Sequence, residues 1–395
     1  MRILLLCYEY PPIGGGGGVG AKKYAESWAR KGHDVTVLTS RTEGLEDREK
    51  VAGVHVVRVR TFGKEQRATS TVLSMLTYLL SGLAHLVRNR GDYRDVQVVN
   101  THFSLPTGPL GWAASRLLAV PDVLTIIGGD IYDPSKDRSP HRHRSLRAVN
   151  RFLIRAAKDV VAISTDTEAR AREHYDIRRP IRVINYGFSP PDEDQIEQVR
   201  LPSSRDDRYY LIAIGRLVRR KGFGYLIEAV RRLPEDVELL LIGDGPLEDR
   251  LRSEARRRGV EERIHLLGYQ SSPRVYGYLL QADCFVLSSL HEGLGIVVQE
   301  AMWAGLPIVA TNNGGQVDLV EDGRNGILVR PGDTTGLTEA VLSLYENPGI
   351  AARMAEANRS DIRDYHVDSN SEQYLDRFRT LAHRGDGRTG PSSRA

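Results

Sequence analysis

The feature that most limits the fold of this chain is an alternation of short apolar segments with amphipathic ones, which occurs in two successive series. The first series runs over residues 2–164 and the second over residues 209–329. The short segments are continuous runs rich in Val, Ile and Leu, such as RILLLC at residues 2–7. Strands buried on both faces have this composition, and strands separated by helices pair in parallel. The pattern therefore predicts two α/β domains, each a doubly wound, Rossmann-like parallel sheet.

A polar segment separates the two series. Residues 191–207 lose the apolar pattern and are dominated by Pro, Ser and acidic residues, which is typical of an interdomain linker. Because doubly wound sheets bind ligands beyond the carboxyl ends of their strands, two such domains that face each other across a cleft would suit a reaction between two substrates. We expect an N-terminal domain at 1–190, a C-terminal domain at 208–368, a helix at 369–385 that returns to the N-terminal domain, and a disordered tail at 386–395.

The composition narrows the class of protein. The 395 residues include 55 Lys and Arg against 51 Asp and Glu, a net charge of only +4, which argues against a nucleic-acid-binding protein. The two cysteines, Cys7 and Cys284, lie in predicted strands and are too few for a disulfide framework or a cysteine metal site. The first residues lack a signal-peptide pattern, and the apolar segment 72–87 is shorter than the ~20 residues of a spanning helix. We therefore expect a cytoplasmic protein.

A run of glycines follows the first predicted strand. Residues 11–20 read PPIGGGGGVG, and Gly15, Gly17 and Gly20 formally match a dinucleotide-binding fingerprint. An oxidoreductase is disfavoured because the loop is too long and no acidic residue ends the second strand. Glycines let a backbone approach an anion closely, and we expect a helix from Ala21 to present its amides there. The run thus predicts a phosphate or sugar contact, with a flexible loop as the alternative.

Charged residues follow several strands of the second series. Arg216 and Lys221 come after the first of these strands, a position that suits a diphosphate. Glu292 and Glu300 flank a glycine-containing loop and a short helix, whose first amides can face a phosphate. Glu300 would lie on the helix, where a carboxylate can accept hydrogen bonds from a ribose diol.

Four segments together resemble the donor half of family 4 glycosyltransferases, which are retaining enzymes with the GT-B fold. These segments are GRLVRRKG at 215–222, GDGP at 243–246, HEGLGIVVQEAMWAGLPIVAT at 291–311 and EDGRNGILVRPGD at 321–333. The resemblance implies a nucleotide-diphosphate sugar, UDP- or GDP-linked, held by the C-terminal domain without a metal ion or other cofactor. It implies transfer of a hexosyl group to a hydroxyl of a saccharide or a lipid-linked acceptor in the N-terminal domain.

The resemblance also implies roles for individual residues. Arg216 and Lys221 would neutralise the diphosphate, Glu300 would bind the ribose hydroxyls, and Glu292 would bind the donor sugar near the reacting carbon. The leaving phosphate would accept the proton of the attacking hydroxyl. The segment around Gly268 and Tyr269 would contribute to the choice of base. Further donor contacts are expected from the backbone of Gly15, Gly16, Gly17, Gly243, Gly295, Ile296 and Val297.

One position departs from the family pattern. Many relatives carry a His before the Gly of a strand-end motif, where this chain has Ile127 in VLTIIGGD. An isoleucine cannot hydrogen-bond a sugar hydroxyl. His102, at the end of the preceding strand, is our candidate substitute, although a structural histidine is an equal alternative. Asp130 is a second candidate catalytic residue on the acceptor side.

Other interpretations stay open at this stage. The basic segment 136–147 could meet an acidic acceptor or an anionic membrane, although a solvated loop is the stronger interpretation. The apolar helix at 72–87, flanked by Arg88 and Arg90, could lie on a bilayer, although a packed core helix is favoured. Peripheral membrane contact would follow from a lipid-linked acceptor. A GT-B epimerase, a phosphorylase or a non-catalytic partner subunit are alternative functions. A classical phosphorylase needs a pyridoxal-binding lysine, for which the second domain offers only Lys221.

Overall fold

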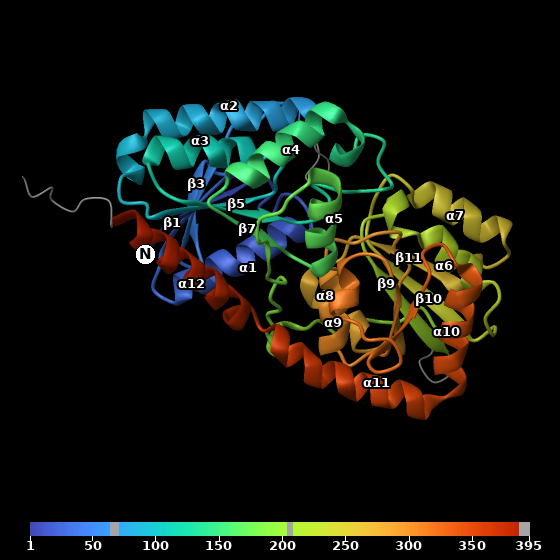
Figure 1. Cartoon of the computed structure of the whole chain (residues 1–395). Helices are drawn as coiled ribbons and strands as arrows, with labels where there is room; N and C mark the ends of the chain where they lie inside the picture. Colours follow the sequence, from blue (N-terminus) through green and yellow to red (C-terminus); the bar gives the residue numbers. More distant parts are fainter. Residues whose placement is uncertain (64–70, 204–207, 387–395) are drawn as a thin grey trace, which may run out of the picture. The chain divides into compact units, whose positions relative to one another are not determined.

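The computed structural model describes residues 1–63, 71–203 and 208–386, which form two compact units (Figure 1). The first unit contains Met1–Asp133, Arg138–Gly187 and His366–Ala395, and the second contains Pro134–Asp137 and Phe188–Tyr365. The expected linker 191–207 is thus part of the second unit as far as it is described. The expected tail at 386–395 lies, except for Asp386, outside the described residues.

The first unit is built on an eight-stranded sheet with the order β3-β4-β2-β1-β5-β6-β7-β8. All neighbouring strands are parallel except the pair β3 and β4, which is antiparallel. The strands are β1 (Arg2–Cys7), β2 (Asp34–Ser40), β3 (Arg48–Val51), β4 (Val54–Val59), β5 (Val98–His102), β6 (Asp122–Ile126), β7 (Asp159–Ala162) and β8 (Arg182–Val183). The helices are α1 (Gly16–Arg30), α2 (Val72–Arg88), α3 (Gly108–Leu118), α4 (Arg144–Ala156), α5 (Thr165–Tyr175) and α12 (Val367–Asp386).

The last helix, α12, packs against α1 within the first unit. Trp28 of α1 is fully buried and contacts the rings of Tyr374 and Phe378 edge-on. The indole Nε1 of Trp28 donates a hydrogen bond of 3.1 Å to the carbonyl of Ser371. These contacts hold a segment from the end of the described chain beside the helix that follows β1 (Figure 1).

The second unit is built on a six-stranded parallel sheet with the order β11-β10-β9-β12-β13-β14. Its strands are β9 (Tyr209–Ile214), β10 (Val237–Ile242), β11 (Ile264–Gly268), β12 (Cys284–Leu287), β13 (Ile308–Thr311) and β14 (Gly326–Val329). Its helices are α6 (Phe223–Val230), α7 (Glu248–Arg257), α8 (Ser272–Leu279), α9 (Ile296–Trp303), α10 (Thr334–Glu346) and α11 (Pro348–Asp361).

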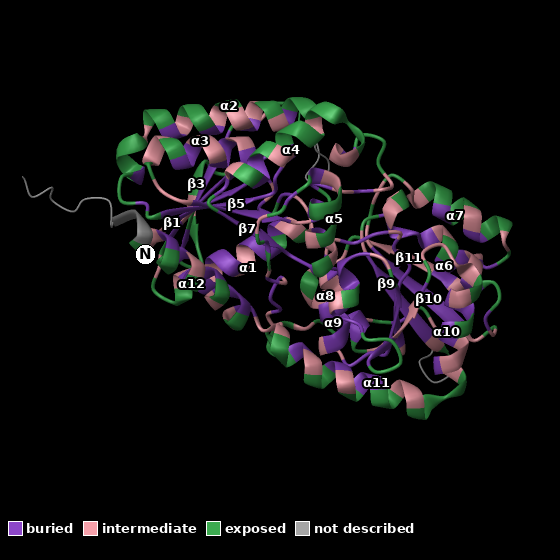
Figure 2. Cartoon of the chain, viewed as in Figure 1, coloured by how far each residue is buried: buried purple, intermediate pink, exposed green. Residues whose placement is uncertain are grey.

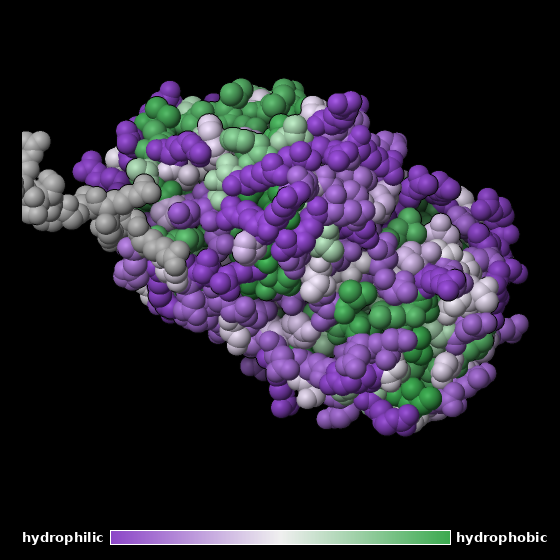
Figure 3. Space-filling model, in the orientation of Figure 1, coloured by the Kyte–Doolittle hydropathy of each residue, from purple (hydrophilic) through white to green (hydrophobic). Residues whose placement is uncertain are grey.

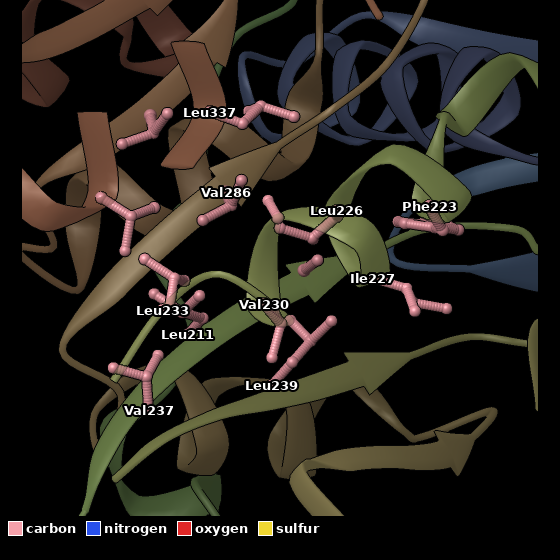
Figure 4. Packing of buried hydrophobic residues seen from close by; sticks show 14 of the residues in the cluster. Leu211, Phe223, Leu226, Ile227, Val230, Leu233, Val237, Leu239, Val286 and Leu337 are labelled. Carbon is pink, nitrogen blue, oxygen red and sulfur yellow. The ribbon is translucent and has the colours of Figure 1, made fainter. Parts of the chain in front are cut away.

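The central strands of both units are buried over nearly their whole length, as their apolar sequences predict, whereas the edge strand β3 is largely exposed (Figure 2). In the second unit, Leu226 and Val230 of α6 pack with Leu211 of β9 and Leu239 of β10 in one continuous core (Figure 4). Two doubly wound sheets confirm the predicted fold class. Within the described residues, no helix is both long enough and apolar enough to span a bilayer.

The structure corrects two predictions about helices. The first helix begins at Gly16 rather than at Ala21, so that most of the glycine run is helical. The helix at 72–87 is not enclosed in the core, because Leu73, Leu76 and Leu80 are exposed (Figure 2).

Candidate functional site

The predicted donor residues of the second unit gather where the strand order of its sheet reverses. β9 is flanked by β10 on one side and β12 on the other. The strands β10 and β11 extend the sheet in one direction from β9, and β12, β13 and β14 extend it in the other. Gly215 follows β9 directly, and the segment 288–292 follows β12. Doubly wound sheets bind ligands at such a reversal, beyond the carboxyl ends of the strands.

Glu292 is the centre of a buried ion cluster that bridges the ends of β9 and β12. Its Oε1 lies 2.7 Å from Nζ of Lys221, and its Oε2 lies 3.1 Å from Nη1 of Arg220. The hydroxyl of Ser289 donates a third hydrogen bond to Oε1 at 2.7 Å. Both Glu292 and Lys221 are buried. The lysine after β9 and the glutamate after β12, for which the sequence predicted separate ligands, are therefore in direct contact.

The charges of this cluster oppose the effect of burial. Burial alone would raise the pKa of Glu292, but the adjacent Lys221 and Arg220 outweigh it and hold this pKa below its ordinary value. Burial lowers the pKa of Lys221, and the carboxylate of Glu292 acts in the opposite direction. We conclude that Glu292 is an ionised carboxylate at neutral pH and that it supports the charge of Lys221.

The turns around this cluster accept only glycine. Gly222 has φ +66°, and a Cβ there would overlap the carbonyl oxygen of Ser288. Gly243 has φ +136°, and a Cβ there would overlap the carbonyl oxygen of Gly215. Both conformations are ones that side chains disfavour. The glycines thus let the turns after β9, β10 and β12 approach each other and bring Lys221 to Glu292.

Helix α9 supplies further groups beside Glu292. Gly295 precedes the helix with φ +86°, and Ile296 and Val297 form its first turn, where backbone amides have no intrahelical acceptor. Glu300 lies on the same helix and is half-buried. The exposed Arg216 is near enough for its charge to lower the pKa of Lys221, after the larger effect of burial. The site thus carries cations and helix amides suited to an anion.

The glycine run of the first unit serves close packing. Gly16, Gly17, Gly18 and Gly20 all lie in α1, and a Cβ at Gly20 would lie 2.5 Å from the ring of Tyr186. At Gly17 a Cβ would overlap the side chain of Ile127. The run was expected to be a loop, but its glycines let the first turns of α1 pack against the strand ends.

The same glycine run flanks the reversal point of the first sheet, which lies between β1 and β5. The amide of Gly15 donates to Oε2 of Glu9 at 3.2 Å, so this predicted ligand contact is occupied by a carboxylate of the same loop. Gly16 and Gly17 open α1, where amides of the first turn lack intrahelical acceptors.

His102 and Asp130 lie at the carboxyl ends of β5 and β6, as predicted, but both are buried. The imidazole of His102 stacks on Tyr186, with 3.3 Å between Nδ1 and the Tyr186 hydroxyl, and its Nε2 has no partner among the described residues. Burial lowers the pKa of His102 to about 3. A contact between His102 and a sugar would require neighbouring side chains to move.

The carboxylate of Asp130 ties two loops together. It accepts hydrogen bonds from the amide of Ser104 at 2.6 Å and from the amide of Ile127 at 3.0 Å. Burial raises its pKa to about 6 despite these hydrogen bonds. The arrangement gives Asp130 a positioning role for the segment that contains Ile127, which replaces the usual histidine of the family.

Sequence reasoning missed two members of the Glu292 cluster, Arg220 and Ser289. Arg220 lies in the basic turn RLVRRKG, whose sequence alone does not show which of its cations contacts Glu292. In the structure its guanidinium also donates to the carbonyl of His291 at 3.2 Å. Ser289 is the second residue after β12, and this position is the only indication of its role that the sequence gives.

Comparison with solved structures identifies the class of fold. Sucrose-phosphate synthase from Thermosynechococcus elongatus superposes with a TM-score of 0.84 at 21% identity, covering 97% of this chain and 99% of that one. Alr3699/HepE from Anabaena, in complex with UDP and glucose, superposes with a TM-score of 0.77 at 22% identity, over 96% of this chain and 100% of that one. The two Rossmann-like units therefore form a GT-B glycosyltransferase fold, which confirms the predicted class.

The family follows from the sequence. Residues 194–361 match the family described as "Glycosyl transferases group 1", and residues 15–187 match the "Glycosyl transferase 4-like domain". Glycogen synthase from Mycobacterium tuberculosis is 29% identical over 382 residues, which cover 91% of this chain and 89% of that protein. The chain belongs to the group 1 glycosyltransferases and is an enzyme of this class. The resemblance seen in its motifs is thereby confirmed.

Proposed function

We propose that this glycosyltransferase moves a hexosyl group from a nucleotide-diphosphate sugar to a hydroxyl of a saccharide or lipid-linked acceptor, with retention of configuration and without a metal ion. The observation that carries the proposal is the ionised Glu292, which is held between Lys221 and Arg220 at the reversal point of the second sheet. A sugar donor has a diphosphate that needs cations and hydroxyls that need acceptors. This cluster offers both cations and an acceptor where the segments that follow β9 and β12 meet.

The diphosphate leaves with additional negative charge as its bond to the sugar carbon breaks. Lys221, Arg216 and the first amides of α9 would stabilise this charge, which is the work that a metal ion performs in other transferases. Lys221 has three N–H donors, so it can contact a phosphate and keep its bond to Glu292. Gly243 would bring backbone close to the same phosphate.

The ionised Glu292 cannot protonate the leaving group, because its pKa lies below the ordinary value. Its carboxylate would accept hydrogen bonds from donor hydroxyls beside a reacting carbon that develops positive charge. The acceptor oxygen would form its bond to this carbon on the face from which the phosphate departs. The proton of the acceptor hydroxyl would pass to the departing phosphate oxygen, so that no separate base is required.

The nucleoside would lie farther along the same edge of the sheet. Glu300 on α9 is the proposed ligand of the ribose hydroxyls. Tyr269 follows β11 and is 76% exposed, which makes its ring available to stack on a base. The solved complex of Alr3699/HepE contains UDP, which supports a UDP-linked donor ahead of a GDP-linked one.

We infer that the enzyme works in a reducing, cytoplasmic compartment and needs no cofactor. Cys7 and Cys284 form no disulfide in the part of the chain that the structure describes, and both are buried in strands of separate units. Burial raises the pKa of Cys284 far above its ordinary value, which keeps this thiol protonated.

The test is a panel of UDP-, GDP- and ADP-linked sugars, scored by thermal stabilisation and by slow donor hydrolysis, with and without EDTA. Arg216→Ala and Glu300→Ala are expected to lose both signals. Glu356→Ala and Arg353→Ala, which remove matched charges from the exposed face of α11, are the controls. Once an acceptor is found, NMR of the first product should show the anomeric configuration of the donor.

A different experimental result would contradict each part of the proposal. Absence of stabilisation by any nucleotide sugar at low-millimolar concentration would contradict the donor site. Loss of activity in EDTA would contradict metal independence, and an inverted product would contradict retention. Stabilisation by NAD would favour an oxidoreductase, and release of an epimerised nucleotide sugar would favour an epimerase.

A further inference from the structure

One face of α2 consists of exposed aliphatic side chains. Leu73, Leu76, Leu80, Leu83 and Val87 recur at intervals of three and four residues, and Leu80 is 70% exposed. Successive positions of this spacing lie on one side of a helix. No charged residue occurs between residues 72 and 87. We call these five residues the α2 stripe.

The opposite face of the same helix already packs against the first unit. Ser74, Tyr78, Gly82 and Leu86 are its buried residues, and Gly82 lies so close to α3 that a Cβ would meet Leu110 at 2.6 Å. The α2 stripe therefore lies on the face of the helix that does not pack against the rest of the first unit. Soluble proteins rarely expose large contiguous apolar patches, and where they do, the patch marks a contact with a protein, a membrane or a ligand.

A row of arginines lies on the same layer of helices. Arg144, Arg147, Arg151 and Arg155 of α4 line a hollow of about 680 Å³ together with the exposed Phe152. Helix α4 has no acidic residue. Arg155 pairs with Asp176 at 2.9 Å, but neither Arg144, Arg147 nor Arg151 forms an ion pair with any residue that the structure describes. These three members of the arginine row are thus available to bind anions.

Helix α3 connects the two features. It packs against α2 and α4, and Trp112 of α3 contacts Phe152 of α4 edge-on with 5.6 Å between ring centroids. The guanidinium of Arg116 lies over the same indole ring, 4.2 Å from its centroid. In space-filling view an apolar area over α2 adjoins a hydrophilic band over α4 (Figure 3). Apolar and cationic groups thus share one surface.

We propose that the α2 stripe and the arginine row form a docking surface for an anionic lipid bilayer. The aliphatic side chains would enter the boundary between headgroups and acyl chains, and the arginines would bind headgroup phosphates. A second copy of this chain would match the aliphatic stripe, but it would place one arginine row against another across a symmetric contact. Charge complementarity therefore favours the bilayer. The proposal does not depend on the identity of donor or acceptor.

The test is sedimentation of the full chain with vesicles of phosphatidylcholine alone and with vesicles that also contain phosphatidylglycerol. Two variants address the two parts of the surface, namely Leu76→Gln/Leu80→Gln and Arg144→Gln/Arg147→Gln/Arg151→Gln. Leu280→Gln, which changes an exposed leucine of the second unit, and Arg250→Gln/Arg252→Gln/Arg257→Gln on α7 are the matched controls. Thermal unfolding and donor hydrolysis check that each variant is folded.

We expect the wild type to bind the anionic vesicles and to be released by salt. The arginine variant should bind them roughly a hundredfold more weakly, since each cation near an anionic surface contributes about one tenfold step or somewhat less. The leucine variant should lose binding at every salt concentration. Absence of wild-type binding, or equal binding to neutral vesicles, would overturn the proposal. A concentration-dependent dimer that the leucine variant abolishes would instead assign the stripe to a second copy.

Discussion

Acidification is expected to destabilise the first unit through His102, because this imidazole is neutral in the folded protein. Burial lowers its pKa to about 3, whereas a histidine in an unfolded chain has a pKa of about 6.5. Below the unfolded value the unfolded chain binds a proton at this residue and the folded chain does not. The contribution of His102 to the free energy of unfolding is therefore fully present above pH 6.5 and is lost as the pH falls toward the folded value. From about pH 7 to about pH 5 the loss amounts to about 2 kcal/mol.

The assay is urea unfolding at these two pH values, with His102→Asn beside the wild type. The amide can still donate toward the Tyr186 hydroxyl, but it cannot take up a proton. Its smaller volume lowers stability at both pH values, so the change between them is the quantity to compare. Tryptophan emission in a Trp303→Phe background reports on the first unit, which contains Trp28 and Trp112.

The wild type should lose about 2 kcal/mol more than His102→Asn between the two pH values. His55→Asn, which removes an exposed histidine of β4, controls for the loss of a histidine elsewhere in the same unit. If His102→Asn loses as much stability as the wild type on acidification, the imidazole is not held neutral in the folded state and the reasoning is refuted.

Three further changes test other parts of the structure. Gly20→Ala should lower the free energy of unfolding by about 1–3 kcal/mol in urea titrations, because its Cβ would lie 2.5 Å from the ring of Tyr186; unchanged stability would show that α1 does not pack as closely as described. Phe378→Ala should cost about 3–5 kcal/mol in the same assay, because this ring is fully buried against α1, and a loss below about 1 kcal/mol would mean that α12 contributes little. Arg220→Gln should lower kcat/KM and move the acidic limb of the pH–rate profile upward, because removing this cation raises the pKa of Glu292; an unshifted limb would contradict the role of Arg220.

The sequence was sufficient to predict the fold class because strands that are buried on both faces of a sheet have continuous apolar sequences. The apolar runs at β1, β9 and β10 became central strands of two parallel sheets, as predicted. The edge strand β3 was not predicted, since its sequence REKV is polar and it pairs on one side only. Edge strands of this kind carry little of the apolar pattern on which the prediction rests.

Part of the candidate site could likewise be predicted from the sequence and part of it could not. The positions of Lys221 and Glu292 after two strands were enough to assign both to one donor site, because the carboxyl ends of parallel strands share one edge, but they did not predict the ion pair between them. The sequence could not show that Arg220, rather than its neighbours in the same basic turn, reaches Glu292, since this depends on the left-handed turn at Gly222.

The start of α1 within the glycine run was predicted at Ala21 instead of Gly16 for a related physical reason. A loop that binds an anion and a helix that packs closely both require residues without side chains. Only the positions of Tyr186 and Ile127, which are far away in sequence, distinguish the two cases. The sequence favoured a packed core helix over an exposed apolar face for α2, because a helix with aliphatic residues on all sides has the same sequence pattern whether one face or both faces are covered.

The return of α12 to the first unit has a consequence for the order in which the chain can fold during synthesis. The second unit is continuous from Phe188 to Tyr365 apart from a four-residue segment, and the amide of Phe188 donates to the carbonyl of Tyr365 at 2.6 Å, so its two ends are joined. A ribosome completes this unit before it makes α12. Until then Trp28 and Tyr24 of α1 lack the aromatic partners that bury them. The first half of the protein to be made is therefore the last to be finished, and its exposed aromatic surface is the part that a chaperone would meet.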